Sequence, residues 1–335
     1  MSRQGVEAKP PWRQVPAAVR REVESVAGAR VTRGARIWGG YGPAPTFRLR
    51  LADGRGLFFK GIHTESTVFS RKAFDREWRV YQELGAFITP WAPQFYGAIA
   101  VDDWRALLLE DLGPKSAPPW TPALARDAAR EFARFHSSTL GRDLPGWLRR
   151  FAESGASVSW ERVEEETDGL RLVADLAGGR ADEARAWLRM ALPPLARGAR
   201  DALRIPGPYA LLHSDTRSDN LRVTQGRLRL FDWPAAESGY PEFDLAAFAQ
   251  SVTAEGGPEP ERIVSWYSER LHPRAEALDA VVAWLAAYFA HNAWRPDLPE
   301  LPRLRRFQRQ QLAVTLRWAA RRLALPAPEW ARALD

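Results

Sequence analysis

The sequence predicts an α+β protein with a small antiparallel sheet near its N-terminus and a mostly helical remainder. Up to residue 109, short runs that alternate apolar and polar side chains are typical of half-buried strands. From residue 122 onward, apolar side chains recur at helical spacing instead. A segment rich in Pro and Gly, which interrupts regular structure, separates the two patterns. We therefore expect an N-terminal lobe over residues 1–109 and a C-terminal lobe over residues 110–335.

Five strands and one main helix are expected in the first lobe. The expected strands are one that leads into a glycine-rich segment, and then residues 46–51, 57–62, 95–101 and 105–109. Helical spacing of apolar side chains predicts the main helix over residues 70–84 and an amphipathic helix over residues 15–27. Short turns at Asp53-Gly54 and Asp102-Asp103 indicate an antiparallel meander.

The glycine-rich segment contains Gly39, Gly40 and Gly42. Glycines between two strands can place backbone N–H groups over phosphates, because no Cβ obstructs the approach. An ordinary hairpin turn has the same composition, so both interpretations stay open.

Lys60 is a single cation inside an otherwise apolar strand. Because burying an unpaired charge is costly, this position implies an acidic partner. In the helix predicted over residues 70–84, Glu77 lies at the edge of the apolar stripe, about 60° around the helix from Phe74. We expect a Lys60–Glu77 ion pair. The alternative is an edge-strand lysine in solvent and a solvated glutamate.

Residues 211–245 carry the polar groups on which the functional prediction depends. Asp215 follows an apolar strand-like run, Asn220 lies five residues later, and Asp232 ends a second strand after a predicted hairpin with Gly226 at its turn. A carboxylate can accept a hydrogen bond from an incoming hydroxyl, and amide and carboxylate oxygens bind Mg²⁺. The alternative is that Asp215 and Asp219 only cap turns and Asn220 fills a left-handed position.

This arrangement resembles the aminoglycoside phosphotransferase and choline kinase group, small-molecule kinases with a bilobal protein-kinase-like fold. Residues 213–220 resemble the catalytic loop of the family, and Phe231-Asp232-Trp233 resembles its metal-binding segment. Residues 239–245 resemble its G-x-P-x-x-D-L stretch. The similarity covers residues 30–250, with Ser214 where the family usually has Gly and Pro234 where an acidic residue is common.

The resemblance implies an enzyme that uses ATP and Mg²⁺ to phosphorylate a hydroxyl of a small molecule. In the second lobe, the resemblance implies that Asp215 orients the acceptor and accepts its proton, that Arg217 contacts the γ-phosphate, and that His213 and Asp244 support the catalytic loop. It implies Mg²⁺ binding by Asn220 and Asp232, and an adenine hinge at Glu110 and Leu112. In the first lobe, it implies that Lys60, with Glu77 as its partner, neutralises the phosphates and that Gly39, Gly40 and Gly42 contact them as the phosphate loop.

Composition excludes several other classes. There is no Cys, which removes disulfides, thiolate metal sites and cysteine nucleophiles. The longest wholly apolar run, residues 280–290, is too short to span a bilayer, so we expect a cytoplasmic protein that does not enter membranes. The formal charge of +7 invites nucleic-acid binding, but the Arg residues are dispersed among acids, so nucleic acid is not expected as a partner. Oligomeric state is not indicated.

The alternatives concern the acceptor and the class of protein. The acceptor hydroxyl can belong to a sugar, to an amino alcohol such as choline or homoserine, or to an antibiotic, and we rank the antibiotic below a metabolic or detoxifying acceptor. An aminoglycoside-type antibiotic is a polycation, which suits this basic chain only if the acidic run at residues 161–168 lines the pocket. The same run can instead be a solvated helix face. A pseudokinase or a nucleic-acid-binding module without catalysis is the alternative outside enzymes, and the helix at residues 304–323 is locally basic.

The remaining helical patterns cover residues 181–203, with an expected break at Pro193-Pro194, and then 241–254, 260–270 and 275–292. His136 shares an apolar helix face and is expected to be a satisfied core histidine, and His272 and His291 are expected to be structural.

Overall fold

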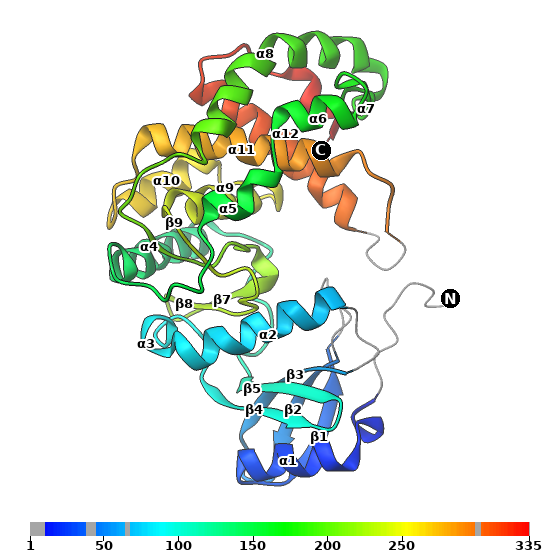
Figure 1. Cartoon of the computed structure of the whole chain (residues 1–335), viewed down its shortest axis with the longest axis vertical. Helices are drawn as coiled ribbons and strands as arrows, with labels where there is room; N and C mark the ends of the chain where they lie inside the picture. Colours follow the sequence, from blue (N-terminus) through cyan, green and yellow to red (C-terminus); the bar gives the residue numbers. More distant parts are fainter. Residues whose placement is uncertain (1–10, 38–44, 64–67, 299–302, 335) are drawn as a thin grey trace. The chain divides into compact units, whose positions relative to one another are not determined.

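The computed structural model describes residues 11–37, 45–63, 68–298 and 303–334, and its contacts divide the chain into two units (Figure 1). The first unit contains Met1–Ser116, Asp219–Arg222 and Arg229–Ala235, and the second contains Ala117–Ser218, Val223–Leu228 and Ala236–Asp335. The boundary after residue 109 that the sequence predicts stays a prediction.

The first unit is built on a five-stranded antiparallel sheet, as predicted. Its strands, in spatial order, are β1 (Val31–Arg36), β2 (Thr46–Leu51), β3 (Gly56–Ile62), β5 (Trp104–Glu110) and β4 (Phe95–Val101). The β2–β3 connection turns at Gly54, whose φ of 89° is one that a side chain would disfavour.

The two faces of this sheet have different roles. Helix α1 (Ala17–Ala27) buries Val19 and Val23 against Phe47 and Phe59, which gives this face an apolar core. Figure 1 shows helix α2 (Val68–Glu83) on the opposite side of the sheet from α1. Because successive side chains of a strand point to opposite faces, Phe59 faces α1 and Lys60 faces α2. The fold thus directs the one cation of β3 toward α2.

The second unit is mostly helical. Its helices are α4 (Pro122–Thr139), α5 (Phe151–Ser154), α6 (Trp160–Glu166), α7 (Arg171–Asp175), α8 (Ala181–Asp201), α9 (Glu242–Ala254), α10 (Pro260–Ser268), α11 (Ala275–Ala293) and α12 (Leu304–Arg322). α11 lies against α8, α9 and α12 and is buried along most of its length. Among the residues that the structure describes, no helix combines the length and apolar character needed to cross a membrane.

The expected break at Pro193-Pro194 is wrong, because α8 continues through both residues. Each proline removes a hydrogen bond to the carbonyl four residues earlier. Those carbonyls belong to Arg189 and Met190, which are exposed, so water can satisfy them. Buried contacts of Leu188 and Leu195 on the other face hold the helix together.

Short strands position the two polar loops. β6 (Ala210–Leu212) pairs with β9 (Glu237–Gly239) and is wholly buried, so the loop that begins at His213 has a fixed start. β7 (Leu221–Thr224) and β8 (Arg227–Leu230) form the predicted hairpin. Its turn residues Gln225 and Gly226 have φ of 51° and 71°, the left-handed geometry that matches strand twist.

Candidate functional site

In the first unit, Lys60 joins two carboxylates from distant parts of the chain. Its Nζ donates to Glu77 Oε2 at 2.5 Å and to Asp232 Oδ1 at 2.6 Å. The expected Lys60–Glu77 contact is therefore present, and Glu77 is 1% exposed whereas the Asp232 side chain is 39% exposed. A ligand from solvent can therefore reach the carboxylate of Asp232 but not that of Glu77.

The charges of Lys60, Glu77 and Asp232 influence one another's pKa values. Burial raises the pKa of Glu77, and the nearby Asp232 carboxylate adds to this, while Lys60 opposes both. Burial disfavours the Lys60 ammonium, but Asp232 and Glu77 outweigh that effect and raise its pKa. Two carboxylates thus share the ammonium of Lys60, and the Asp232 carboxylate would also attract a metal cation.

Asn220 and Asp232 are brought together by the hairpin backbone. The N–H of Phe231 donates to the carbonyl of Asn220 at 3.0 Å, which places the residue after Phe231 beside Asn220. Asp232 itself has a φ of 66°, a conformation that costs an L-residue about 1–2 kcal/mol. Trp233 holds the turn with a bond from Nε1 to the Leu230 carbonyl at 3.0 Å.

This donor set fits a magnesium ion that also binds nucleotide phosphates. Within the described ranges, the chain offers no group of three or more His, Asp or Glu side chains arranged to hold a metal. Mg²⁺ commonly takes only one or two protein oxygens and completes its shell with water and substrate phosphates. The amide oxygen of Asn220 and the carboxylate of Asp232 suit that mode.

In the second unit, Asp244 fixes the loop that begins at His213. The fully buried Asp244 accepts from the N–H of His213 at 2.7 Å and from that of Ser214 at 2.9 Å. Ser214 has a φ of 62°, which explains why glycine suits this position in the family that the sequence resembles. His136 Nδ1 meets Tyr267 Oη at 2.8 Å, so it is the satisfied core histidine that the sequence predicts.

Asp215 and Arg217 face each other on this loop. Arg217 Nη2 donates to Asp215 Oδ2 at 3.2 Å, and Nε lies 3.2 Å from Oδ1. The Asp215 side chain is 36% exposed and the Arg217 side chain 21%. The resemblance assigns Arg217 to the γ-phosphate, and in this structure the guanidinium orients the carboxylate of Asp215.

A positioning contact that sequence reasoning missed lies beside this loop. Glu255 Oε1 accepts from Ser218 Oγ at 2.5 Å, and Glu255 Oε2 accepts from Trp120 Nε1 at 2.7 Å. Glu255 follows α9, 37 residues after Ser218, and no motif marks it.

The remaining predicted residues belong to the hinge and to the glycine-rich segment. Glu110 ends β5, and its Oε2 accepts from the Gln94 N–H at 3.1 Å, while Leu112 is partly buried after the strand. Gly39, Gly40 and Gly42 lie outside the described residues. Their assignments stay predictions.

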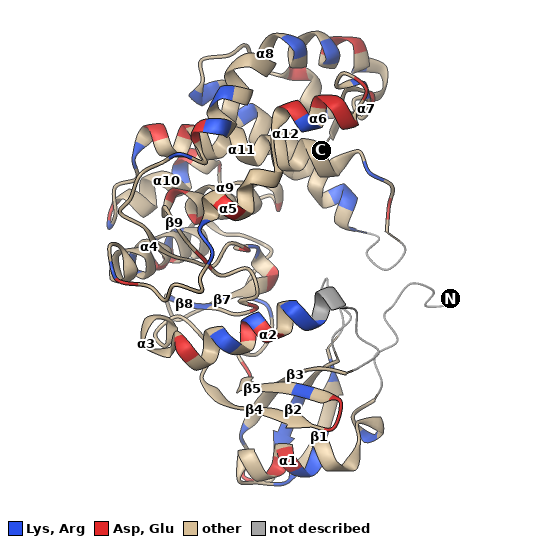
Figure 2. Ribbon diagram, in the orientation of Figure 1, with Lys and Arg blue, Asp and Glu red and all other residues tan. Residues whose placement is uncertain are grey.

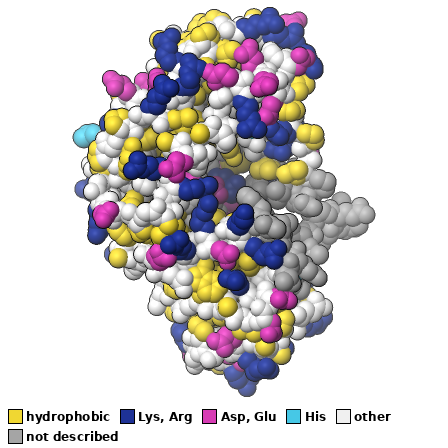
Figure 3. Space-filling model, viewed as in Figure 1, with side chains coloured by type: hydrophobic (Ala, Val, Ile, Leu, Met, Phe, Trp, Pro, Cys, Tyr) yellow, Lys and Arg dark blue, Asp and Glu magenta, His cyan; other side chains and the backbone are white. Residues whose placement is uncertain are grey.

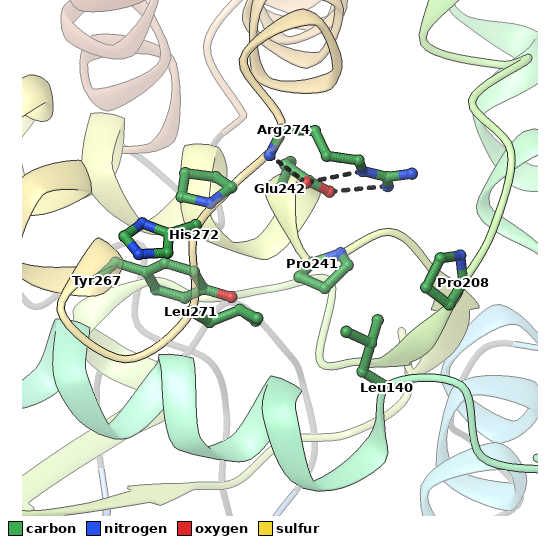
Figure 4. A pocket seen from close by; sticks show the side chains of 9 residues that line it. Leu140, Pro208, Pro241, Glu242, Tyr267, Leu271, His272 and Arg274 are labelled. Atoms are coloured by element: carbon green, nitrogen blue, oxygen red, sulfur yellow. Dashed lines mark hydrogen bonds and ion pairs between the residues drawn. The ribbon is translucent and has the colours of Figure 1, made fainter.

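Figure 4 shows a pocket in the second unit that contains none of the predicted site residues. Its one carboxylate, Glu242, accepts from Arg274 Nε and Nη2, each at 3.1 Å, and from the Arg274 N–H at 2.8 Å. Both carboxylate oxygens of Glu242 are thus satisfied by Arg274, and the remaining lining of the pocket is mainly apolar.

One family model identifies the family of this chain. The model of the phosphotransferase enzyme family matches residues 34–278. A putative fructosamine-3-kinase from Thermobifida fusca is 22% identical, with a TM-score of 0.50 over 95% of this chain and 98% of that chain. One from Haemophilus somnus is 17% identical, with a TM-score of 0.54 over 88% and 97%.

A spectinomycin phosphotransferase, solved with ADP and spectinomycin, is 12% identical, with a TM-score of 0.56 over 82% of this chain and 85% of that chain. At these identities the likenesses establish the fold. Comparison with curated proteins gives no match.

Proposed function

Because the chain belongs to the phosphotransferase enzyme family and is a small-molecule kinase, we propose that it transfers the γ-phosphate of ATP to a hydroxyl group with the help of Mg²⁺. The observation that carries the proposal is the contact of Lys60 with both Glu77 and Asp232. Glu77, which is buried, fixes the ammonium of Lys60. Asp232, which is more exposed, would give up its contact with this ammonium and bind the metal instead. The ADP in the spectinomycin phosphotransferase structure supports nucleotide use by this fold.

Lys60, Asn220 and Asp232 would bind the nucleotide. When bound, Mg²⁺ neutralises charge on the phosphates and orients the γ-phosphoryl group. Lys60 would then turn its charge from Asp232 to the phosphates while Glu77 keeps its position. Glu110 and Leu112 would follow the adenine ring, and Gly39, Gly40 and Gly42 would approach the phosphates through their backbone.

Asp215 would act on the acceptor. Its carboxylate would accept the hydrogen bond of the attacking hydroxyl and take its proton as the phosphoryl group moves. Arg217 Nη2 donates to that carboxylate, and Asp244 fixes the backbone before it. In a loose phosphoryl-transfer transition state such positioning supplies most of the catalysis.

We propose the lobe division after residue 109, a cytoplasmic location and a metabolite acceptor as part of this function. An antibiotic acceptor is a second candidate, since a structural neighbour is a spectinomycin phosphotransferase. On the face shown in Figure 3, Lys and Arg side chains alternate with Asp and Glu, which supports a mixed charged surface over a nucleic-acid-binding one.

The test is release of ADP from Mg²⁺-ATP against a panel of hydroxylated metabolites and antibiotics. We expect Asp215→Ala to lower kcat by about 10²-fold or more while Mg²⁺-ATP still stabilises the protein against heat. The matched control is Asp182→Ala, which removes a fully exposed carboxylate from α8 and should leave turnover unchanged. Turnover in Asp215→Ala equal to that of the wild type would refute the assignment.

A further inference from the structure

Helix α9 carries two acids that contact the loop of residues 213–218. Asp244, in the first turn of the helix, accepts from the two N–H groups with which the loop begins. Glu255 directly follows the last residue of α9, and its Oε1 accepts from Ser218 Oγ at 2.5 Å. One helix therefore contacts both ends of the 213–218 loop.

The two acids lie on the same face of α9. An α-helix turns about 100° and rises about 1.5 Å per residue, so the step from Asp244 to Glu255 is about three full turns plus 20°, and about 16 Å along the axis. Between the two ends, Thr216 Oγ1 donates to the Asp244 carbonyl at 3.4 Å. The 213–218 loop therefore runs along this face, in the same direction as the helix.

Trp120 fixes the position of the Glu255 carboxylate. The buried indole donates from Nε1 to Glu255 Oε2 at 2.7 Å. Its ring meets Phe248 of α9 edge-on, with ring centroids 5.7 Å apart and an interplanar angle of 80°. A Cβ added at Gly257 would come within 2.8 Å of the Trp120 Cβ, so the chain after α9 also packs closely against this side chain. Because Trp120 is packed against two parts of the chain, it holds Oε2 in place and leaves Oε1 for Ser218.

Acids elsewhere in the second unit have a different role. Figure 2 shows acidic residues on α6, and these include Glu161, which pairs with Arg200, and Glu166, which pairs with Arg162. Ion pairs of this kind near the surface add little to stability. Glu255 differs from them because its carboxylate binds a side chain of the 213–218 loop.

Ser218 is the residue through which Glu255 acts on the loop. It is 4% exposed, and it lies between Asp215 and Asn220 in the sequence. A hydrogen bond to a carboxylate is shorter and stronger than one between neutral groups. Fixing Ser218 therefore fixes the backbone that leads from the proposed base Asp215 toward the proposed metal ligand Asn220.

We propose that Glu255 is a positioning residue, which holds the end of the 213–218 loop so that the Asp215 carboxylate meets the acceptor hydroxyl in a fixed place. This inference rests on the proposed function, in which Asp215 accepts the proton of that hydroxyl. Asp244 holds one end of the loop and Glu255 the other, and between them the Asp215 side chain is 36% exposed. Because small displacements of a reacting group are costly in rate, a loop held at both ends favours catalysis.

Three variants test this role by their kinetics with Mg²⁺-ATP and the best acceptor from the ADP-release screen. Glu255→Gln leaves one acceptor oxygen for two donors, and Ser218→Ala removes the hydroxyl. We expect each to lower kcat about tenfold and to leave the KM for ATP nearly unchanged, because a charge-assisted bond to the loop is lost. Trp120→Phe keeps the ring but removes the N–H, and it should lower kcat less, because the contact with Ser218 remains. The double variant of Glu255→Gln and Ser218→Ala should be about as slow as the slower single variant, because both changes break one contact.

The matched control is Glu259→Gln, which makes the same change in an exposed side chain shortly after Glu255 and should keep the kcat of the wild type. A lower unfolding free energy of Glu255→Gln with unchanged kcat overturns the inference, since the contact is then only structural. A double variant about a hundredfold slower than the wild type also overturns it, because the two side chains then act separately. An unchanged kcat in Trp120→Phe overturns the part given to Trp120.

Hydrogen exchange gives a readout that does not need turnover. Exchange of the backbone N–H groups in the 213–218 loop is followed by mass spectrometry with fragmentation, in the wild type and in Glu255→Gln. We expect exchange at residues 216–218 to become about tenfold faster, while His213 and Ser214 stay protected by Asp244. Faster exchange at both ends of the loop, or at neither, overturns the inference.

The two measurements separate this inference from the proposed function. If no acceptor of the panel is phosphorylated but exchange at residues 216–218 rises in Glu255→Gln, the phosphotransfer reaction is refuted and Glu255 still holds the loop. If ADP release depends on Asp215 while Glu255→Gln changes neither kcat nor exchange, the reaction stands and the role given to Glu255 is wrong.

Discussion

Replacing Glu77 by Gln tests whether the buried carboxylate holds the Lys60 ammonium in place to bind the phosphates of ATP. The variant keeps an oxygen that can accept from Lys60 Nζ but removes the charge. A hydrogen bond between charged groups contributes about 1.5–3 kcal/mol and a neutral one about 0.5–1.5, so we expect a loss of about 1–1.5 kcal/mol of unfolding free energy. The larger penalty of an orphaned buried charge does not apply, because Asp232 remains 2.6 Å from Lys60.

The same change should weaken nucleotide binding. Without the charge of Glu77, Lys60 depends on Asp232 alone, and Mg²⁺ must compete with the ammonium for that carboxylate. A loss of about 1 kcal/mol corresponds to about a fivefold higher Kd for Mg²⁺-ATP. Asp232→Asn should change stability less, because Asp232 is more exposed, but should weaken Mg²⁺-ATP binding more than Glu77→Gln does.

Urea unfolding gives the free energy, and titration calorimetry with Mg²⁺ and an ATP analogue gives the Kd. The matched control is Glu83→Gln on the same helix, where an exposed pair with Arg79 contributes about 0.3–0.5 kcal/mol. If Glu77→Gln and Glu83→Gln lose the same stability and bind nucleotide equally well, the role given to Glu77 is wrong.

Three further changes test the second unit. Ser214→Gly should raise the unfolding free energy by up to about 1 kcal/mol, because φ is 62° at this position, and a lower value in urea unfolding would contradict the strain argument. Glu255→Gln weakens the bonds from Ser218 and Trp120 and should lower kcat more than it raises the KM for ATP, whereas unchanged kinetics would make the contact merely structural. Burial lowers the pKa of His291 below 6.5, so its contribution to stability is present above pH 6.5 and is lost as pH falls through the lowered pKa. His291→Gln should abolish this decrease of the unfolding free energy at low pH. A pH profile of unfolding identical to that of the wild type would contradict the role given to His291.

The sequence predicted the strands, the helices and one ion pair because each depends on local periodicity. A period of two residues places Lys60 on one face of β3, and a period of 3.6 places Glu77 on the matching edge of α2. The break expected at Pro193-Pro194 was wrong because packing of the opposite face of α8 outweighs the lost hydrogen bonds. Local propensity predicts an element, and tertiary contacts decide its length.

The sequence by itself determined the fold class, which follows from periodicity, and the family, which follows from short motifs such as residues 213–220. Only the tertiary structure decided which partners the polar groups of the site have. Asp232 lies 172 residues after the lysine it contacts, and Glu255 lies 135 residues after Trp120, so no spacing rule connects them. The pairing of buried charges is set by distance in space and not along the sequence.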